Sequence, residues 1–195
     1  MRQLTLAGLL VTGLMLGLLP AASAQARPKR CPNAGVVAEN TRAKLFVKVH
    51  DDSEYTLRGC MKKSRKRTTL LEWFNCGCST GDQPAPQYEL TRRFAAVNRW
   101  GCAPDGSICT GTTTVTDLKL RAELRTVDTG GGVSDLVVTT RGNLALIGPH
   151  GLQRSDATGQ ATLDLSPTAG SLAWAGGTHT LYWTTLSLAR SAPLD

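Results

Sequence analysis

Beyond its first 24 residues the chain lacks the long apolar runs and the amphipathic periodicity that mark membrane spans and helical domains. No later segment approaches the ~20 consecutive apolar residues that a transmembrane helix needs. A glycosylation sequon, a phosphate-binding loop and a dinucleotide fingerprint are also absent. What remains is a succession of short apolar segments separated by turn residues, which indicates β-structure.

Metal-ligating residues are few and scattered. The sequence has three histidines, His50, His150 and His179, and none belongs to a cluster with the spacing of a metal site. We therefore expect neither a metal ion nor another cofactor.

The N-terminus has the organisation of a secretory signal peptide, residues 1–24. Arg2 supplies the positive charge, Leu4 to Leu19 form the apolar region, and Ala22-Ser23-Ala24 is a small-residue cleavage site. The alternative is an uncleaved membrane anchor, but the apolar run is shorter than a span of ~20 residues. We expect export, so that the protein works in a secreted or extracytoplasmic location.

An even number of cysteines follows this segment. In an exported chain, six cysteines predict three disulfide bonds, and 15 pairings are possible. The six residues are Cys31, Cys60, Cys76, Cys78, Cys102 and Cys109. Cys102 and Cys109 flank Pro104-Asp105-Gly106, a turn sequence that would bring their sulfur atoms together.

The other four cysteines leave alternatives open. Cys60 is expected to pair with Cys76 or Cys78, and the other of these two with Cys31. A redox or metal-binding role for the Cys76-Gly77-Cys78 pair is the weaker interpretation, since an exported chain with this many cysteines favours structural disulfides.

Residues 25–35 predict an irregular N-terminal segment, and residues 36–195 predict a single all-β domain of about four repeat units. Alternation at Leu118, Leu120, Ala122 and Leu124 also has the period of a strand. The other expected strands are 36–38, 45–49, 55–61, 68–74, 94–100, 133–140, 144–147, 152–157 and 161–165, followed by a hairpin unit over 171–194.

Four segments share a pattern in which a polar turn precedes an apolar strand. They are AKLFVKV (43–49), RRFAAVNRW (92–100), RGNLALI (141–147) and THTLYWT (178–184). Phe46, Ala96, Ala145 and Tyr182 hold similar positions in them. Their spacing is close to the roughly 40–50 residues of a propeller blade.

The segment VTDLKL (115–120) resembles the V-x-D-L strand of WD-type and TolB-like propeller blades, and DLVVTTRGNLALIG (135–148) resembles an inner blade hairpin. TLYWTTLSLARSAPL (180–194) resembles a closing blade, although the Trp-Asp dipeptide of the WD type is absent. The resemblance implies a propeller-like array of antiparallel blades. The alternative is a β-sandwich or barrel whose hairpins look alike.

Catalytic motifs are weak. Gly77-Cys78-Ser79-Thr80-Gly81 matches the nucleophile-elbow pattern, but prolines follow where that chemistry needs a helix. His50 lies beside Asp51 and Asp52, which is also compatible with a solvated loop. A hydrolase that uses Ser79 or His50 is therefore the alternative hypothesis, and the main one assigns no catalytic residue.

The densest charge in the chain lies between two expected strands. Lys62, Lys63, Arg65, Lys66 and Arg67 form this cluster, in a chain of formal net charge +7. The cluster could bind phosphate or sulfate groups, or it could be a solvated hairpin tip that discourages strand aggregation. The sequence thus predicts a secreted, non-catalytic binding or scaffold module whose ligand it does not identify. The cluster makes an anionic polymer at the cell surface or in the extracellular space one candidate partner, and the solvated tip is the interpretation that the sequence favours.

Overall fold

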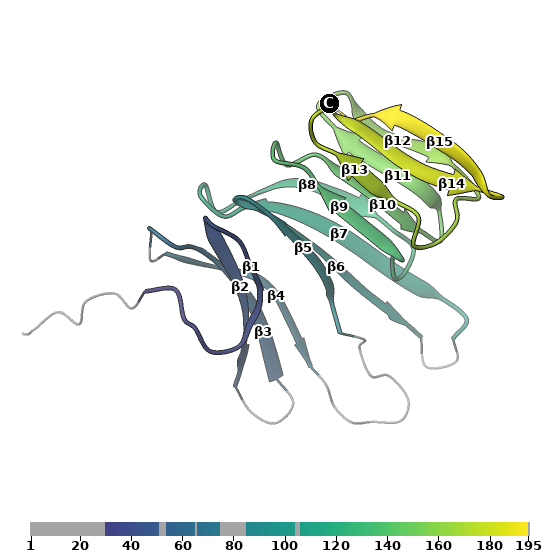
Figure 1. Ribbon diagram of the computed structural model, residues 1–195. Coiled ribbons are helices and arrows are strands. Elements are labelled where there is room, and N and C mark those ends of the chain that lie inside the picture. Colours follow the sequence, from purple (N-terminus) through teal and green to yellow (C-terminus); the bar gives the residue numbers. More distant parts are fainter. Residues whose placement is uncertain (1–29, 51–53, 65, 75–84, 104–105, 195) are drawn as a thin grey trace, which may run out of the picture.

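The structure, a computed structural model, describes residues 30–50, 54–64, 66–74, 85–103 and 106–194. Within these ranges the chain contains no helix and forms four antiparallel sheets (Figure 1). Each sheet is a meander of consecutive strands, and the sheets follow one another in chain order. The all-β class expected from the sequence is confirmed.

The first two sheets have four strands each. Sheet 1 consists of β1 (Val36–Glu39), β2 (Ala43–Val49), β3 (Glu54–Met61) and β4 (Arg67–Phe74). Sheet 2 consists of β5 (Gln87–Thr91), β6 (Phe94–Cys102), β7 (Cys109–Asp117) and β8 (Ala122–Asp128).

The third sheet also has four strands, and the last has three. Sheet 3 consists of β9 (Asp135–Val138), β10 (Leu144–Gly148), β11 (Gly151–Asp156) and β12 (Gly159–Asp164). Sheet 4 consists of β13 (Ala173–Ala175), β14 (Thr180–Thr185) and β15 (Leu188–Pro193). The four similar segments found in the sequence are the second strands of their sheets, β2, β6, β10 and β14.

Apolar clusters hold neighbouring sheets face to face. Leu45 and Leu57 of sheet 1 pack against Val97 of sheet 2. Sheets 2 and 3 share a second cluster, and Leu152 of sheet 3 meets Leu181 of sheet 4 in a third. Burying a leucine side chain contributes about 1.5–3 kcal/mol, so these contacts hold the sheets in a stack.

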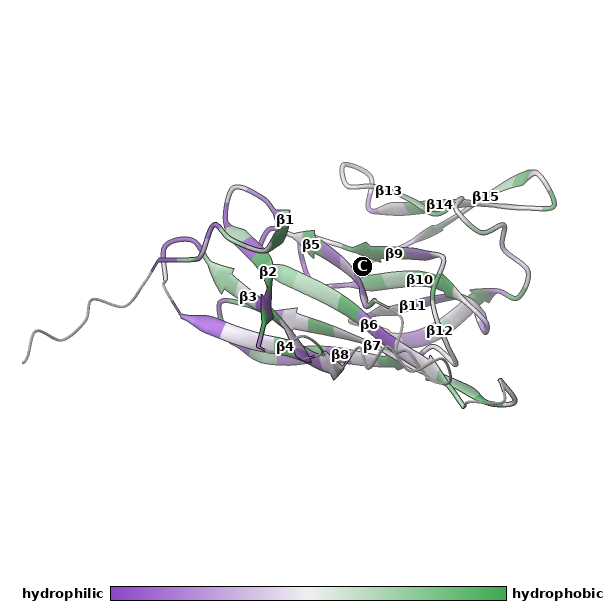
Figure 2. Ribbon diagram, turned by 90° about the horizontal axis from the view of Figure 1, so that it is seen from below, coloured by the Kyte–Doolittle hydropathy of each residue, from purple (hydrophilic) through white to green (hydrophobic). Residues whose placement is uncertain are grey.

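The second strands of the two inner sheets bury both faces. In β6, Ala95 and Val97 belong to the cluster with sheet 1, whereas Phe94 and Ala96 belong to the cluster with sheet 3. Strand β10 is divided in the same way between sheets 2 and 4. In Figure 2 these apolar strands lie in the interior of the stack. An unbroken apolar run is the sequence signature of such a two-sided strand.

The strand expected from the alternation at Leu118, Leu120, Ala122 and Leu124 is wrong in its first half, whereas Ala122 and Leu124 belong to β8. Strand β7 ends at Asp117, and residues 118–121 form a turn. The carboxylate Oδ1 of Asp117 accepts hydrogen bonds from the backbone N–H groups of Lys119 at 2.9 Å and Leu120 at 3.2 Å. These bonds satisfy the turn backbone, as aspartate does in Asx turns. Leu118 is buried, but Leu120 is 62% exposed, so the alternation does not correspond to a buried face.

Two strands were missed from the sequence. Strand β5 follows a proline-rich segment, and β7 begins at Cys109, inside a threonine-rich run that has little apolar alternation. Threonine is β-branched and suits a pleated surface, which is the signal that could have found β7.

Candidate anion-binding surface

One end of the stack is formed by the turns that join the first to the second and the third to the fourth strand of each sheet. Gly59 near the end of β3 has no room for a side chain, because a Cβ atom there would lie 2.4 Å from Leu118 Cδ2 in the β7–β8 turn. A Cβ at Gly142 in the β9–β10 turn would lie 3.0 Å from Phe94 Cδ1 at the start of β6. These contacts bring the turns of sheets 1, 2 and 3 to the same end.

Arg125 of β8 connects sheet 2 to the turns of sheet 3. Its side chain is partly buried and donates hydrogen bonds to the carbonyl oxygens of Gly142 at 3.1 Å and Asp156 at 2.5 Å, and to Asn143 Oδ1 at 3.1 Å. Hydrogen bonds from a charged donor are among the stronger ones. Arg125 therefore has a structural role in positioning the β9–β10 and β11–β12 turns.

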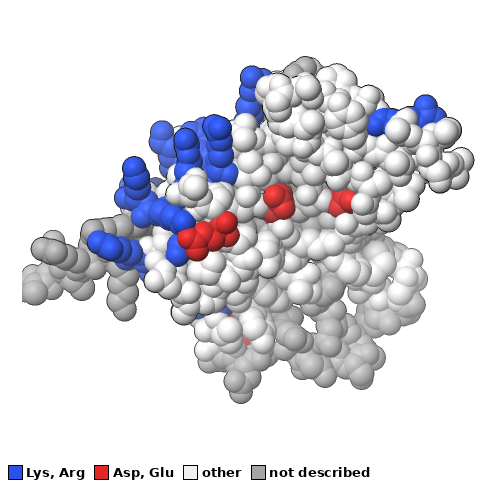
Figure 3. Space-filling view, in the orientation of Figure 1, with Lys and Arg blue, Asp and Glu red and all other residues white. Residues whose placement is uncertain are grey.

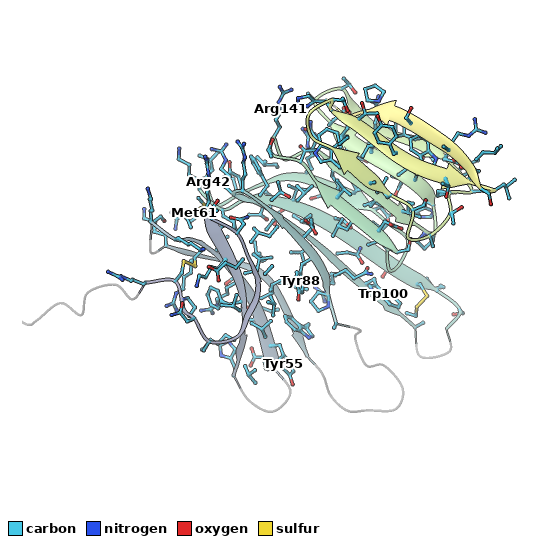
Figure 4. All side chains as sticks on the ribbon, viewed as in Figure 1. Arg42, Tyr55, Met61, Tyr88, Trp100 and Arg141 are labelled. Carbon is cyan, nitrogen blue, oxygen red and sulfur yellow. A yellow bond between two sulfur atoms is a disulfide. The ribbon has the colours of Figure 1, made fainter. Side chains whose placement is uncertain are left out.

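This end carries seven exposed cations, which we call the basic surface. Its residues are Arg42, Lys63, Lys66, Arg92, Lys119, Arg121 and Arg141. Their side chains make no ion pair with another described residue. Figure 3 shows lysine and arginine side chains gathered along this edge of the molecule. In Figure 4, Arg42 and Arg141 lie at this end, whereas Tyr55 and Trp100 lie towards the other.

The basic cluster predicted at residues 62–67 contributes only in part. Lys62 forms an ion pair with Glu39, and Lys44 approaches the same carboxylate at 3.3 Å. The hydrogen bond from Lys62 lowers the pKa of Glu39 below its ordinary value of 4.5. Arg67 lies 5.7 Å from the centre of the Phe46 ring, in a cation–π contact.

Of the five predicted residues, Lys63 and Lys66 lie in the turn and belong to the basic surface. Arg67 is also exposed and has no ion-pair partner among the described residues, but it begins β4 and lies over Phe46, so we do not count it. Arg65 lies outside the described residues. The other five members of the basic surface were missed, because they occur singly or in pairs in separate turns. The sequence feature that could have predicted them is a lysine or arginine in the first and in the third turn of both sheet 1 and sheet 2.

Two members of the basic surface occupy an unusual backbone conformation. Arg92 has φ 54° and Arg121 has φ 59°, in the left-handed region. A residue with a side chain is disfavoured there by about 1–3 kcal/mol, and glycine or asparagine is the usual occupant. The same conformation occurs at His179, Leu186 and Ser187, so it marks tight turns of this fold and does not by itself indicate a need for charge.

Aromatic side chains are absent from the described part of the basic surface. Tyr182 on β14 of sheet 4, 45% exposed, is the exposed aromatic residue of the described ranges. Exposed aromatics at the basic surface would have offered platforms on which nucleic-acid bases stack.

The opposite end of sheet 2 contains a cavity of about 620 Å³. It is lined by residues of the protruding β6–β7 hairpin, among them Arg99, Trp100, Ile108 and Thr112. Among its described lining residues Arg99 is the one ionisable side chain, so they supply no acid–base pair.

The disulfide bonds differ in part from expectation. Cys102 is bonded to Cys109 across the β6–β7 turn, the pair favoured by the sequence. Cys60 is bonded to Cys31 rather than to Cys76 or Cys78. The correction has a physical reason: residues 30–35 return along sheet 1, where the backbone N–H of Val47 donates to the carbonyl of Gly35 at 2.8 Å. Cys76 and Cys78 lie outside the described residues.

The described residues show no catalytic arrangement around Ser79 or His50, the residues of the alternative hydrolase hypothesis. Ser79 lies outside the described residues. His50 Nε2 is 2.9 Å from Thr56 Oγ1, and its Nδ1 is 3.2 Å from Lys48 Nζ, with no carboxylate partner among the described side chains. Within the same ranges, no group of three potential metal ligands is found.

No protein-family model matches the chain, and no curated protein is significantly similar to it. The described ranges also contain no helix that is long and apolar enough to cross a membrane. What the surface can bind has to be read from its own residues.

Proposed function

We propose that the protein is an extracellular, non-catalytic binding module that holds anionic polymers on the basic surface. The observation that carries this proposal is the gathering of seven exposed cations, from five different turns of three sheets, at one end of the stack. Unpaired cations attract sulfate and phosphate groups, and binding releases the counterions of the polymer.

The proposed architecture is an open array of propeller-like blades. Successive antiparallel sheets packed face to face support it, as does a feature shared by sheets 2 and 3. Asp117 and Asp156 each end the third strand of their sheet and accept a hydrogen bond from a turn N–H. Each also pairs with an arginine, Arg93 at 3.0 Å and Arg154 at 3.3 Å.

The functional test is the salt dependence of binding to immobilised heparin. Replacing Arg42, Lys63 and Lys66 with serine should weaken binding and reduce the log–log salt slope by roughly the number of lost contacts, about two to three. The matched control replaces Lys48, Arg99 and Arg190, which are also exposed cations but lie outside the basic surface. It should bind like the wild type. Equal retention of both variants and the wild type at every salt concentration would contradict the proposal.

A further inference from the structure

The cations of the basic surface are arranged on a grid. Turns within one sheet are two strand spacings apart, about 10 Å, and packed sheets are also about 10 Å apart. Sheet 1 supplies Arg42, Lys63 and Lys66, and sheet 2 supplies Arg92, Lys119 and Arg121. With Arg141 of sheet 3, the grid extends over two sheet spacings, about 20 Å.

The charge falls along the stack. The turn between β13 and β14, residues 176–179, contains no lysine or arginine. The turn between β11 and β12, Ala157-Thr158, is also uncharged. The grid is thus longest across the sheets, from sheet 1 to Arg141. Only a ligand with charges along its length can engage all of it at once.

We infer that the basic surface binds a single, linear sulfated polysaccharide that lies across sheets 1, 2 and 3. This inference rests on the proposed function and specifies the class of polymer, its direction and its minimum length. It predicts that a chain too short to span the sheets leaves Arg141 without a contact.

Two observations favour a sulfated polysaccharide over a nucleic acid. Single-stranded nucleic acids are bound through stacked aromatic side chains, and the described part of the basic surface has none. Sequence-specific recognition of double-stranded DNA uses a helix or a two-stranded ribbon that enters the major groove, so the described part of this surface offers no means of reading a DNA sequence. The described residues form no helix, and the turns at this end are short.

Arg92 and Arg121 lie on the path of such a polymer. They come from the first and third turns of sheet 2, in the middle of the grid. A polymer that crosses from sheet 1 to sheet 3 has to pass these two positions. Asparagine is the usual non-glycine residue in their left-handed conformation, so it can replace them without new backbone strain.

The test measures the affinity of the full chain for size-defined heparin disaccharide, hexasaccharide and dodecasaccharide at fixed salt. The wild type should bind the dodecasaccharide at least about fivefold more tightly than the disaccharide, which is too short to span the sheets. Arg141→Ser should weaken dodecasaccharide binding by roughly two- to fivefold and leave disaccharide binding unchanged. The double variant Arg92→Asn, Arg121→Asn should weaken both, and it should fold, because asparagine tolerates the left-handed region.

Arg99→Ser serves as the matched control, since Arg99 is an exposed arginine at the opposite end of β6 from Arg92. Equal affinities for disaccharide and dodecasaccharide, or no effect of Arg141→Ser, would overturn the inference while leaving the proposed function intact. Binding of duplex DNA of similar charge with equal affinity would overturn the choice of polymer class. No binding of any length would overturn the proposed function itself.

Discussion

Sheet 1 and sheet 4 are the first and the last sheet of the stack, and their outer faces differ (Figure 1). In sheet 1 the outward-facing Phe46 is 3% exposed and Cys60 is 1% exposed, and residues 30–35 are fastened there by the Cys31–Cys60 disulfide. In sheet 4 the corresponding aromatic, Tyr182, is 45% exposed. The outer face of sheet 1 is therefore covered, whereas the outer face of sheet 4 is exposed to solvent.

The backbones of the two end sheets differ as well. Three of the five non-glycine residues with left-handed φ, namely His179, Leu186 and Ser187, lie in the turns of sheet 4. In sheet 1 and the segment before it, the described left-handed residue is Gly35, which pays no steric cost. The outer face of sheet 1 is thus closed by a disulfide and apolar packing, whereas sheet 4 leaves Tyr182 and Leu188 exposed.

The largest effect expected from this comparison is at the two aromatic residues that hold similar positions. Phe46→Ala should destabilise the protein by about 3–5 kcal/mol, because it empties a buried site. Tyr182→Ala should cost about 0.5 kcal/mol or less, because its face is exposed. Urea unfolding of both variants measures the difference. Equal losses would show that the open face of sheet 4 is covered in solution.

Removal of the Cys31–Cys60 disulfide comes next. Replacing both cysteines with serine should cost about 2–4 kcal/mol. The matched control, removal of Cys102–Cys109, should cost about 1 kcal/mol less, because the closed loop is shorter. Hydrogen exchange should show that the first variant loosens sheet 1 and leaves sheet 4 unchanged. Loosening of sheet 4 to the same extent would mean that the two ends are not independent.

Lowering the pH should reduce the stabilisation that two carboxylates provide, one bonded to sheet 4 and one in sheet 1. Hydrogen bonds from Thr185 Oγ1, from the Ser166 N–H and from Trp183 Nε1 lower the pKa of Asp164 below its ordinary value of 3.8. Asp164 therefore stabilises the fold above that ordinary value, and the contribution is lost as the pH falls through the lowered pKa. Asp164→Asn should reduce stability at neutral pH and flatten its decline in acid.

The control for this prediction is Glu39→Gln in sheet 1, since the pKa of Glu39 is also lowered, by Lys62. Glu39 is more exposed to solvent screening, so its variant should change the acid profile less. Thermal unfolding between pH 2 and about pH 7 compares the two. An Asp164→Asn profile that runs parallel to the wild type would contradict the assignment.

The smallest effect is expected at the tip of sheet 4. Leu186 and Ser187 both have positive φ, as in the two-residue hairpin turn that Asn-Gly favours. The double variant Leu186→Asn, Ser187→Gly should raise stability by about 0.5–1 kcal/mol, because the relief of left-handed strain exceeds the entropic cost of the added glycine. Urea unfolding of the variant and of the wild type measures the difference. A loss of stability would show that Leu186 makes a contact that its 85% exposure does not reveal.

The candidate site could be predicted only where its residues are adjacent in the chain. The cluster at residues 62–67 was found because its charges are contiguous, and two of its members, Lys63 and Lys66, belong to the basic surface. Arg92, Arg121 and Arg141 could not be assigned to it from the sequence. Their proximity depends on how the sheets stack, which no local pattern encodes.

What the sequence determined by itself is local. Turn residues and β-branched or apolar strands set the all-β class, and the apolar runs at Phe94–Val97 and Leu144–Ile147 predicted strands that the structure contains. The alternating pattern around Leu181 and Trp183 marked a strand with one exposed face. These features depend on neighbours one or two residues away, and so they can be read without the fold.

Only the tertiary structure decided the long-range features. The pairing of Cys31 with Cys60 required residues 30–35 to return along sheet 1, and the end of β7 required Asp117 to bond to its own turn. The basic surface required five turns to meet at one end of the stack. Each of these depends on which sheet faces packed together, a choice made by the summed burial of apolar side chains far apart in the chain.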